Sequence, residues 1–158
     1  MTLIAPSILS ADFADLGREV QRVSSADWLH VDVMDGMFVS NISIGVPVVK
    51  SLRKATDMFL DVHLMIEKPV RYIDAFADAG ADLLSIHLEA DMPPGIRAAL
   101  DAMDKKGVKK GIVLRPITAA ERRHILALAQ EHRAGLWVLT ILYAGLRPGE
   151  TAALSWKD

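Results

Sequence analysis

The sequence predicts an α/β fold in which five parallel strands form part of a (β/α)8 barrel, followed by a helical C-terminal tail. Short apolar segments alternate with segments of helical period, which is typical of a parallel sheet. The strand segments are apolar on one face and polar on the other, whereas a sheet covered by helices on both faces needs continuous apolar runs. A complete barrel takes eight units and about 250 residues. This chain of 158 residues supplies five units.

The elements follow one another in a regular order. The expected strands are 3–9, 28–34, 58–65, 83–89 and 110–114, and the expected helices are 15–23, 47–54, 69–79 and 94–106. Three of these helices begin at a proline, which suits a first helical turn because its N–H groups have no partner inside the helix. Gly80 and Gly107 stand where two helices should end, because glycine readily adopts the left-handed conformation of a helix C-cap.

Side chains alternate across a strand, so the polar residues of neighbouring strands should share one face. The apolar face is expected to carry Leu29, Val31, Val33, Leu60, Val62, Leu64, Leu84, Ile86 and Leu88. The polar face is expected to carry His30, Asp32, Met34, Asp61, His63, Met65, Ser85, His87 and Glu89. In a barrel the polar faces converge at the mouth formed by the C-terminal ends of the strands.

His30, Asp32 and His63 are the candidate metal ligands. Two imidazoles and a carboxylate from adjacent strands suit a borderline divalent cation, and such a cation stabilises an oxyanion beside a carbon that loses its proton. The alternative is that each histidine is a hydrogen-bonded core group. Three such groups in phase would then need a common counter-charge to offset their desolvation.

Further residues of the same mouth are weaker candidates. Ser7 could bind a substrate hydroxyl or cap a turn. Met34 and Met65 could shield a reactive intermediate or pack in the core. His87 and Glu89 are left unassigned between a supporting role and simple lining of the mouth.

Composition excludes several classes of partner. The net charge of −2 leaves no basic field for nucleic acid or an anionic membrane, so neither partner is expected. The chain has no cysteine, so a metal must be held by histidine and carboxylate, and a cytoplasmic location is expected. The N-terminus does not resemble a secretory signal, and the longest apolar run, at 136–146, is too short to span a bilayer.

Five segments carry a family resemblance. Residues 4–12, 30–36, 41–45, 61–65 and 79–82 resemble the signature stretches of the ribulose-phosphate 3-epimerase family in order and spacing. The resemblance covers residues 1–117, which we expect to form the partial ribulose-phosphate-binding barrel. It implies an isomerase that interconverts D-ribulose 5-phosphate and D-xylulose 5-phosphate through an enediolate stabilised by Zn, Fe, Mn or Co. A hexose ketose phosphate is an open alternative substrate.

The resemblance also implies roles for single residues. His30, Asp32 and His63 match three of the family's four metal ligands, and Asp32 matches one of its two acid–base carboxylates. Ser7 matches a serine that contacts the substrate, and Met34 and Met65 match methionines near the intermediate. The second carboxylate, which is also the fourth ligand, and the phosphate-binding loops belong to strands six to eight. These strands have no match here, so the chain alone is expected to be a poor epimerase.

The segment 118–158 is expected to be a separate helical tail. Residues 135–150 and 153–156 resemble the opening of the catalytic domain of tyrosine recombinases, the phage-type integrases, and Arg147 matches an arginine that contacts the scissile phosphate. A DNA-recombination remnant and a non-catalytic fusion fragment are therefore alternative readings of the chain. The unpaired edges of the first and fifth strands favour self-association or a homo-oligomer.

Overall fold

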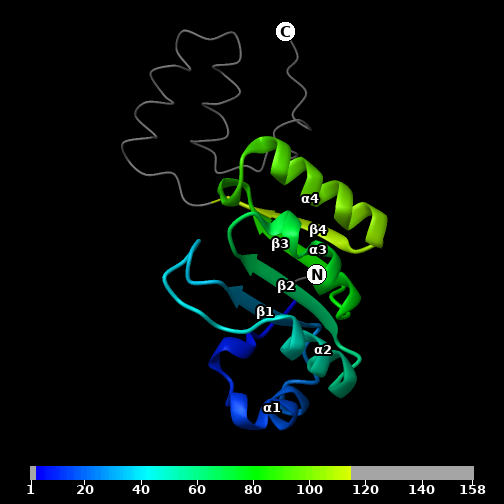
Figure 1. Ribbon diagram of the computed structural model, residues 1–158. Coiled ribbons are helices and arrows are strands. Elements are labelled where there is room, and N and C mark those ends of the chain that lie inside the picture. Colours follow the sequence, from blue (N-terminus) through cyan, green and yellow to red (C-terminus); the bar gives the residue numbers. More distant parts are fainter. Residues whose placement is uncertain (1–2, 115–158) are drawn as a thin grey trace, which may run out of the picture. The chain divides into compact units, whose positions relative to one another are not determined.

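The computed structural model describes residues 3–114, which lie in one compact unit, Met1–Arg115. Its four strands are β1 (Trp28–Met34), β2 (Phe59–Met65), β3 (Leu83–His87) and β4 (Lys109–Val113). They form one parallel sheet in the order β1-β2-β3-β4 (Figure 1). This open sheet with alternating helices confirms the predicted partial barrel. The expected tail 118–158 and its boundary lie outside the described residues.

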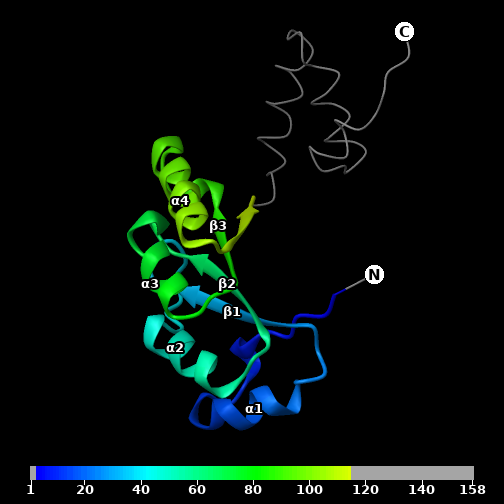
Figure 2. The same ribbon diagram turned by 90° about the vertical axis from the view of Figure 1, so that its right-hand side faces the viewer.

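One helix precedes β1, and the other three connect successive strands. They are α1 (Leu16–Arg22), α2 (Val46–Ala55), α3 (Ile73–Asp78) and α4 (Pro93–Lys106), and α2, α3 and α4 cover one face of the sheet (Figure 2). The expected helix 69–79 is divided into the 3-10 turn η3 (Pro69–Arg71) and α3. Gly107 ends α4 at a φ of 69° as expected, because glycine has no Cβ to strain this conformation. Within residues 3–114, none of the helices combines the length and apolarity needed to cross a membrane.

The expected first strand, 3–9, does not form as a strand of the described sheet. The segment runs along β1 and makes a single parallel bridge, Ser7↔His30, with the His30 N–H donating to the Pro6 carbonyl at 2.9 Å. Proline has no N–H to donate to a ladder. The Ser7 hydroxyl then caps the 3-10 turn η1 (Ile8–Ser10), so the chain leaves the extended conformation there. The described sheet therefore has four strands rather than five.

The strand expected at 83–89 ends earlier than its sequence pattern indicates. Its pairing with β4 stops at His87↔Val113, and the 3-10 turn η4 (Leu88–Ala90) follows. Leu88, expected on the buried face, is 45% exposed. The alternation of apolar and polar residues continues past the last paired residue, so it does not indicate where the strand ends.

The apolar faces of the strands form the core, as predicted. Leu29, Val31, Val33, Leu60, Val62, Leu64, Leu84 and Ile86 are at most 4% exposed. They pack against buried helix residues that include Val49, Leu52, Ile73, Phe76, Ile96 and Met103. Because alternate residues of a strand point to opposite faces, this core leaves the polar residues of β1, β2 and β3 on the face away from the helices.

Truncation of Leu84, within β3, and of Leu88, just past its end, tests this boundary. Leu84→Ala should lower the free energy of unfolding by about 2–5 kcal/mol, because it leaves a cavity in the core. Leu88→Ala should change it by about 0.5 kcal/mol or less, as is usual for exposed positions. Urea denaturation followed by circular dichroism measures both. A large loss from Leu88→Ala would mean that β3 continues with Leu88 in the core.

Candidate metal centre

Parallel pairing in register places the candidate ligands side by side on one face of the sheet. On β1 and β2, His30 pairs with Asp61 and Asp32 pairs with His63. The bridge from Ser7 to His30 brings the N-terminal segment to the same face. Residues that lie far apart in the sequence are therefore brought together by strand pairing.

Asp32 lies between the two histidines. Its Oδ1 is 3.2 Å from His30 Nε2 and 3.3 Å from His63 Nδ1. Each of the three side chains offers one ligand atom, and these three atoms all lie within 4.8 Å of one another. Bonds of about 2.0–2.2 Å to one ion separate neighbouring ligand atoms by about 3–3.5 Å. The two spacings from Asp32 Oδ1 lie in this range, and together with the donor types they fit one divalent cation.

Asp61 supports His30 from the side opposite Asp32. Its Oδ2 lies 2.8 Å from His30 Nδ1, and its Oδ1 is buried without a hydrogen-bond partner in the described part of the chain. The hydrogen bond to Asp61 raises the pKa of His30 above its ordinary value of 6.5, burial opposes this, and Asp32 adds to the rise. A metal ligand must be unprotonated, so a cation bound here competes with a proton on His30.

His63 has a different environment. Its Nε2 lies 2.8 Å from His87 Nε2, and His87 Nδ1 lies 3.3 Å from Glu89 Oε1. Burial lowers the pKa of His63, the neighbouring His87 and His30 lower it further, and Asp32 only partly opposes this. His63 is therefore held in the neutral form that a metal ligand requires.

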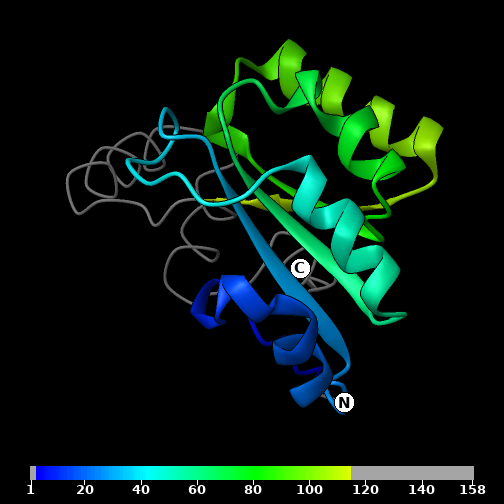
Figure 3. The same ribbon diagram turned by 60° about the horizontal axis from the view of Figure 1, so that its bottom comes forward.

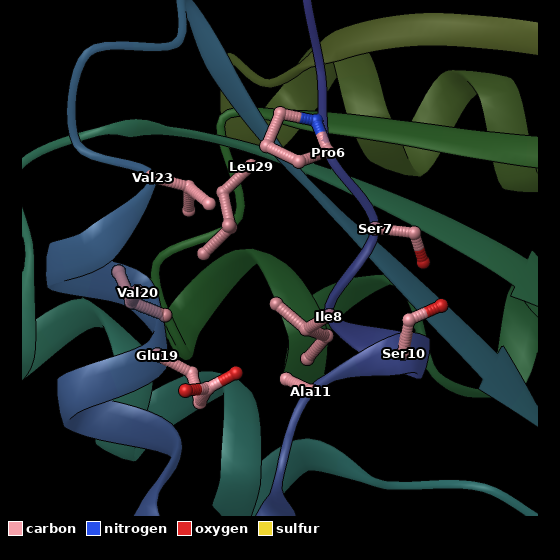
Figure 4. Close-up of a pocket in the computed structure, with 9 residues that line it drawn as sticks. All are labelled: Pro6, Ser7, Ile8, Ser10, Ala11, Glu19, Val20, Val23 and Leu29. Carbon is pink, nitrogen blue, oxygen red and sulfur yellow. The ribbon is translucent and has the colours of Figure 1, made fainter.

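Ser7 contacts the site through Asp32. Its hydroxyl donates to Asp32 Oδ2 at 2.5 Å and accepts from the Leu9 N–H at 3.2 Å. Figure 4 shows that this hydroxyl points away from the apolar cavity of about 180 Å³ lined by residues such as Ile8 and Val20. Ser7 therefore faces the candidate centre, while its neighbour Ile8 faces the core.

Side chains of the loop after β1 form hydrogen bonds with the backbone near the candidate centre. The Ser43 hydroxyl accepts from the Met34 N–H at 2.9 Å and donates to the Asp32 carbonyl at 2.6 Å. Asp35 Oδ1 accepts from the N–H groups of Met37 and Phe38, each at 2.9 Å. These bonds fold the β1–α2 connection back over the C-terminal end of the strand (Figure 3).

The structure brings together the predicted ligands and Ser7, and it places Met34 and Met65 as register partners at the ends of β1 and β2. Met34 also lines a hollow beside Leu9 and Phe13. Sequence reasoning placed Asp61 on the polar face but gave it no role. The repeated pattern of a carboxylate and a histidine two residues apart on paired strands was the available signal.

Comparison with known proteins gives one consistent result. A sequence model described as the ribulose-phosphate 3 epimerase family matches residues 3–132. The chain is 52% identical over 129 residues to a ribulose-phosphate 3-epimerase of Rhodobacter capsulatus, a match that covers 80% of this chain and 56% of the relative. It is 54% identical over 123 residues to that of Bacillus subtilis, covering 77% and 56%. The chain thus spans about half the length of these relatives.

The carboxylate of Asp35 provides a test of the loop. Burial would raise the pKa of Asp35, but hydrogen bonds from the N–H groups of Glu67, Met37 and Phe38 lower it below the ordinary value of 3.8. A carboxyl group with a depressed pKa stabilises the fold above its unfolded pKa, and this contribution is lost as pH falls through the folded pKa. Asp35→Asn should therefore lower stability at neutral pH by about 0.5–1 kcal/mol, because a neutral amide oxygen accepts these hydrogen bonds more weakly than a carboxylate does.

The difference between wild type and Asp35→Asn should shrink as the pH falls below 3.8, because the wild-type group then also loses its charge. Urea denaturation at neutral and at acid pH measures both free energies. Asp57→Asn, at an exposed position, is the matched control and should leave stability unchanged at both pH values. A deficit that is the same at both pH values would contradict the role of the Asp35 charge.

Proposed function

The chain belongs to the ribulose-phosphate 3-epimerase family, and we propose that it supplies the metal ligands and one acid–base carboxylate of an active site that interconverts D-ribulose 5-phosphate and D-xylulose 5-phosphate. The observation that carries the proposal is the convergence of His30, Asp32 and His63 within 4.8 Å of one another. The match to the family supports a ketose phosphate as the substrate of this cluster. Because the chain spans about half the length of its relatives, the complete activity is part of the proposal.

The three side chains have distinct tasks in this reaction. His30, Asp32 and His63 would hold the cation, with Zn, Fe, Mn or Co suited to imidazole and carboxylate ligands. Such a cation stabilises the negative charge that develops on the ketone oxygen when the neighbouring carbon loses its proton. Two neutral histidines and one carboxylate leave a net positive charge at the centre, which favours an anionic intermediate.

Asp32 is the candidate base. Its Oδ1 faces the two histidines, so Oδ2 is the oxygen that can take the proton from the carbon next to the ketone. The Ser7 hydroxyl lies 2.5 Å from Oδ2 and orients this oxygen. When the substrate binds, the Ser7 hydroxyl can form a hydrogen bond with a substrate hydroxyl instead. Met34 and Met65 would then cover the intermediate with polarizable, apolar surface.

Self-association is part of the proposal. In the described sheet, β4 pairs only with β3, and its outer edge carries Ile112 at 52% exposure. Unpaired strand edges with apolar side chains favour pairing with another chain. We therefore propose a homo-oligomer, located in the cytoplasm. The near-neutral charge argues against nucleic acid or an anionic membrane as its partner.

The tail remains a proposal from its sequence pattern. Residues 135–150, with Arg147, support an origin in a tyrosine recombinase, and this segment lies outside the described residues. Under that alternative the chain is a fusion fragment whose barrel part carries no activity. Sequencing genomic DNA across codons 110 to 125 tests whether the two parts belong to one gene.

Metal binding is the first test of the proposed function. The purified chain should bind about one equivalent of Zn²⁺ or Mn²⁺, and His63→Ala should reduce the affinity at least about 100-fold because it removes one of three ligands. Equilibrium dialysis with metal analysis measures this. The exposed-site variant Asp57→Ala should bind as the wild type does. Equal metal content in wild type and His63→Ala would remove the site assignment.

The same preparations can be tested for chemistry. In a coupled assay for D-xylulose 5-phosphate formation, any turnover by the chain should depend on added metal. Asp32→Asn should reduce turnover by about 10²–10⁴-fold, the usual contribution of a general base. Turnover that survives Asp32→Asn would contradict the role of Asp32 as base.

Sedimentation velocity tests the sheet edge. We expect the wild-type chain to sediment as an oligomer, and Ile112→Lys to shift it toward monomer because a charge on an edge strand opposes pairing. Met92→Lys is the matched control, since Met92 is an exposed apolar residue outside the strands. A wild-type chain that sediments only as a monomer would contradict the proposed self-association.

A further inference from the structure

The two candidate ligand histidines use opposite nitrogens. His30 presents Nε2 to Asp32 Oδ1, whereas His63 presents Nδ1 to the same oxygen. A neutral imidazole carries its proton on one nitrogen and a lone pair on the other. Ligation therefore requires His30 to be protonated on Nδ1 and His63 to be protonated on Nε2. These are different tautomers, so each ring needs its own partner to select it.

Asp61 selects the tautomer of His30. Its Oδ2 lies 2.8 Å from His30 Nδ1, closer than Asp32 Oδ1 lies to Nε2 at 3.2 Å. An ionised carboxylate only accepts hydrogen bonds, so the shorter contact favours Nδ1 for the single proton of the neutral ring. The other carboxylate oxygen, Oδ1, is buried and has no hydrogen-bond partner in residues 3–114. The only hydrogen-bond partner of the Asp61 carboxylate in these residues is therefore the His30 ring.

His87 and Glu89 select the tautomer of His63. Only one proton can lie between His63 Nε2 and His87 Nε2, which are 2.8 Å apart. If His87 donated this proton, its unprotonated Nδ1 would face Glu89 Oε1 at 3.3 Å, and two acceptors would oppose each other. If His63 donates it, the His87 Nδ1–H points to the Glu89 carboxylate, and the lone pair of His63 Nδ1 faces Asp32 Oδ1 at 3.3 Å. A cation held between these two atoms binds both lone pairs, so the arrangement suits the metal-bound centre.

The rings are held in place for this arrangement. The imidazoles of His63 and His87 stack with centroids 5.0 Å apart and planes inclined by 20°. The ring of Phe38, from the loop after β1, lies 4.9 Å from the His87 ring. The side chain of His87 is 13% exposed, so little water competes for its nitrogens.

We propose that each candidate ligand histidine is held in its ligating tautomer by a separate carboxylate, His30 directly by Asp61 and His63 through His87 by Glu89. This inference rests on the proposed function, because it concerns the same centre. Asp61 and His87 act here as positioning residues: they direct a lone pair of each ligand at the centre and do not touch the cation. A hydrogen bond from the far nitrogen to a carboxylate also makes a ligating imidazole more basic.

Zn²⁺ affinity tests the two positioning residues separately. Asp61→Ala and His87→Ala should each weaken Zn²⁺ binding by about 10–100-fold, measured by competition with a chromophoric chelator. His87→Gln should restore most of the affinity, because its side-chain oxygen can accept from His63 Nε2–H. Asp57→Ala, which removes an exposed carboxylate near the start of β2, is the control and should bind as wild type does. Thermal unfolding of each variant shows whether the fold is retained.

Nitrogen-15 NMR of the histidine rings reads the tautomers in the protein saturated with Zn²⁺. In this state His30 should be protonated on Nδ1 and His63 on Nε2. Asp61→Ala should give His30 a mixture of tautomers and leave His63 unchanged, and His87→Ala should do the reverse. These responses would not arise from a residue that only fills space.

The outcomes separate this inference from the function it rests on. If wild type binds Zn²⁺ through His63 but Asp61→Ala and His87→Ala bind equally well, or if the rings show the opposite tautomers, the inference is wrong and the metal centre stands. If wild type and Asp57→Ala bind no Zn²⁺, the metal centre and the inference both fail.

Discussion

The parallel pairing of β1 with β2 is the constraint on which the site depends. Val31 pairs with Val62, both fully buried, and this register places His30 opposite Asp61 and Asp32 opposite His63. Because side chains alternate with period two, a slip of one residue would exchange the two faces of a strand. Such a slip would bury the polar groups under the helices and expose the core residues. The packing of the core therefore maintains the geometry of the candidate centre, although the apolar residues of the core are not part of that centre.

The same pairing gives the two histidines different electrostatic properties. His30 lies between two carboxylates, and its hydrogen bond to Asp61 outweighs burial, so its pKa rises. His63 lies between Asp32 and a second imidazole, and burial dominates, so its pKa falls. A cation that binds here finds His63 neutral and competes with a proton on His30. Metal affinity should thus increase with pH until the proton on His30 no longer competes.

Sequence periodicity was sufficient to predict the parallel sheet, its buried face and the clustering of His30, Asp32 and His63, because alternation follows directly from strand geometry. It was not sufficient to predict strand ends. Leu88 continues the apolar alternation of β3, but the partner strand ends before it, and only the pairing reveals this. In segment 3–9 the apolar composition resembled a strand, while Pro6 and the Ser7 cap limited it to one bridge. The role of Asp61 depends on the register between strands, which a single sequence does not specify.

Epimerisation through an enediolate requires a proton to leave from one face of the carbon and return to the other, so it requires two acid–base groups. Among residues 3–114, Asp32 is the carboxylate that lies at the candidate centre with an oxygen free of the histidines. One oxygen of Asp61 is hydrogen-bonded to His30 and the other is buried, and Glu89 Oε1 contacts His87 Nδ1. Neither can reach the opposite face of a substrate without releasing a histidine that the cation needs. Under the proposed function, the second acid–base group would therefore come from outside the described residues.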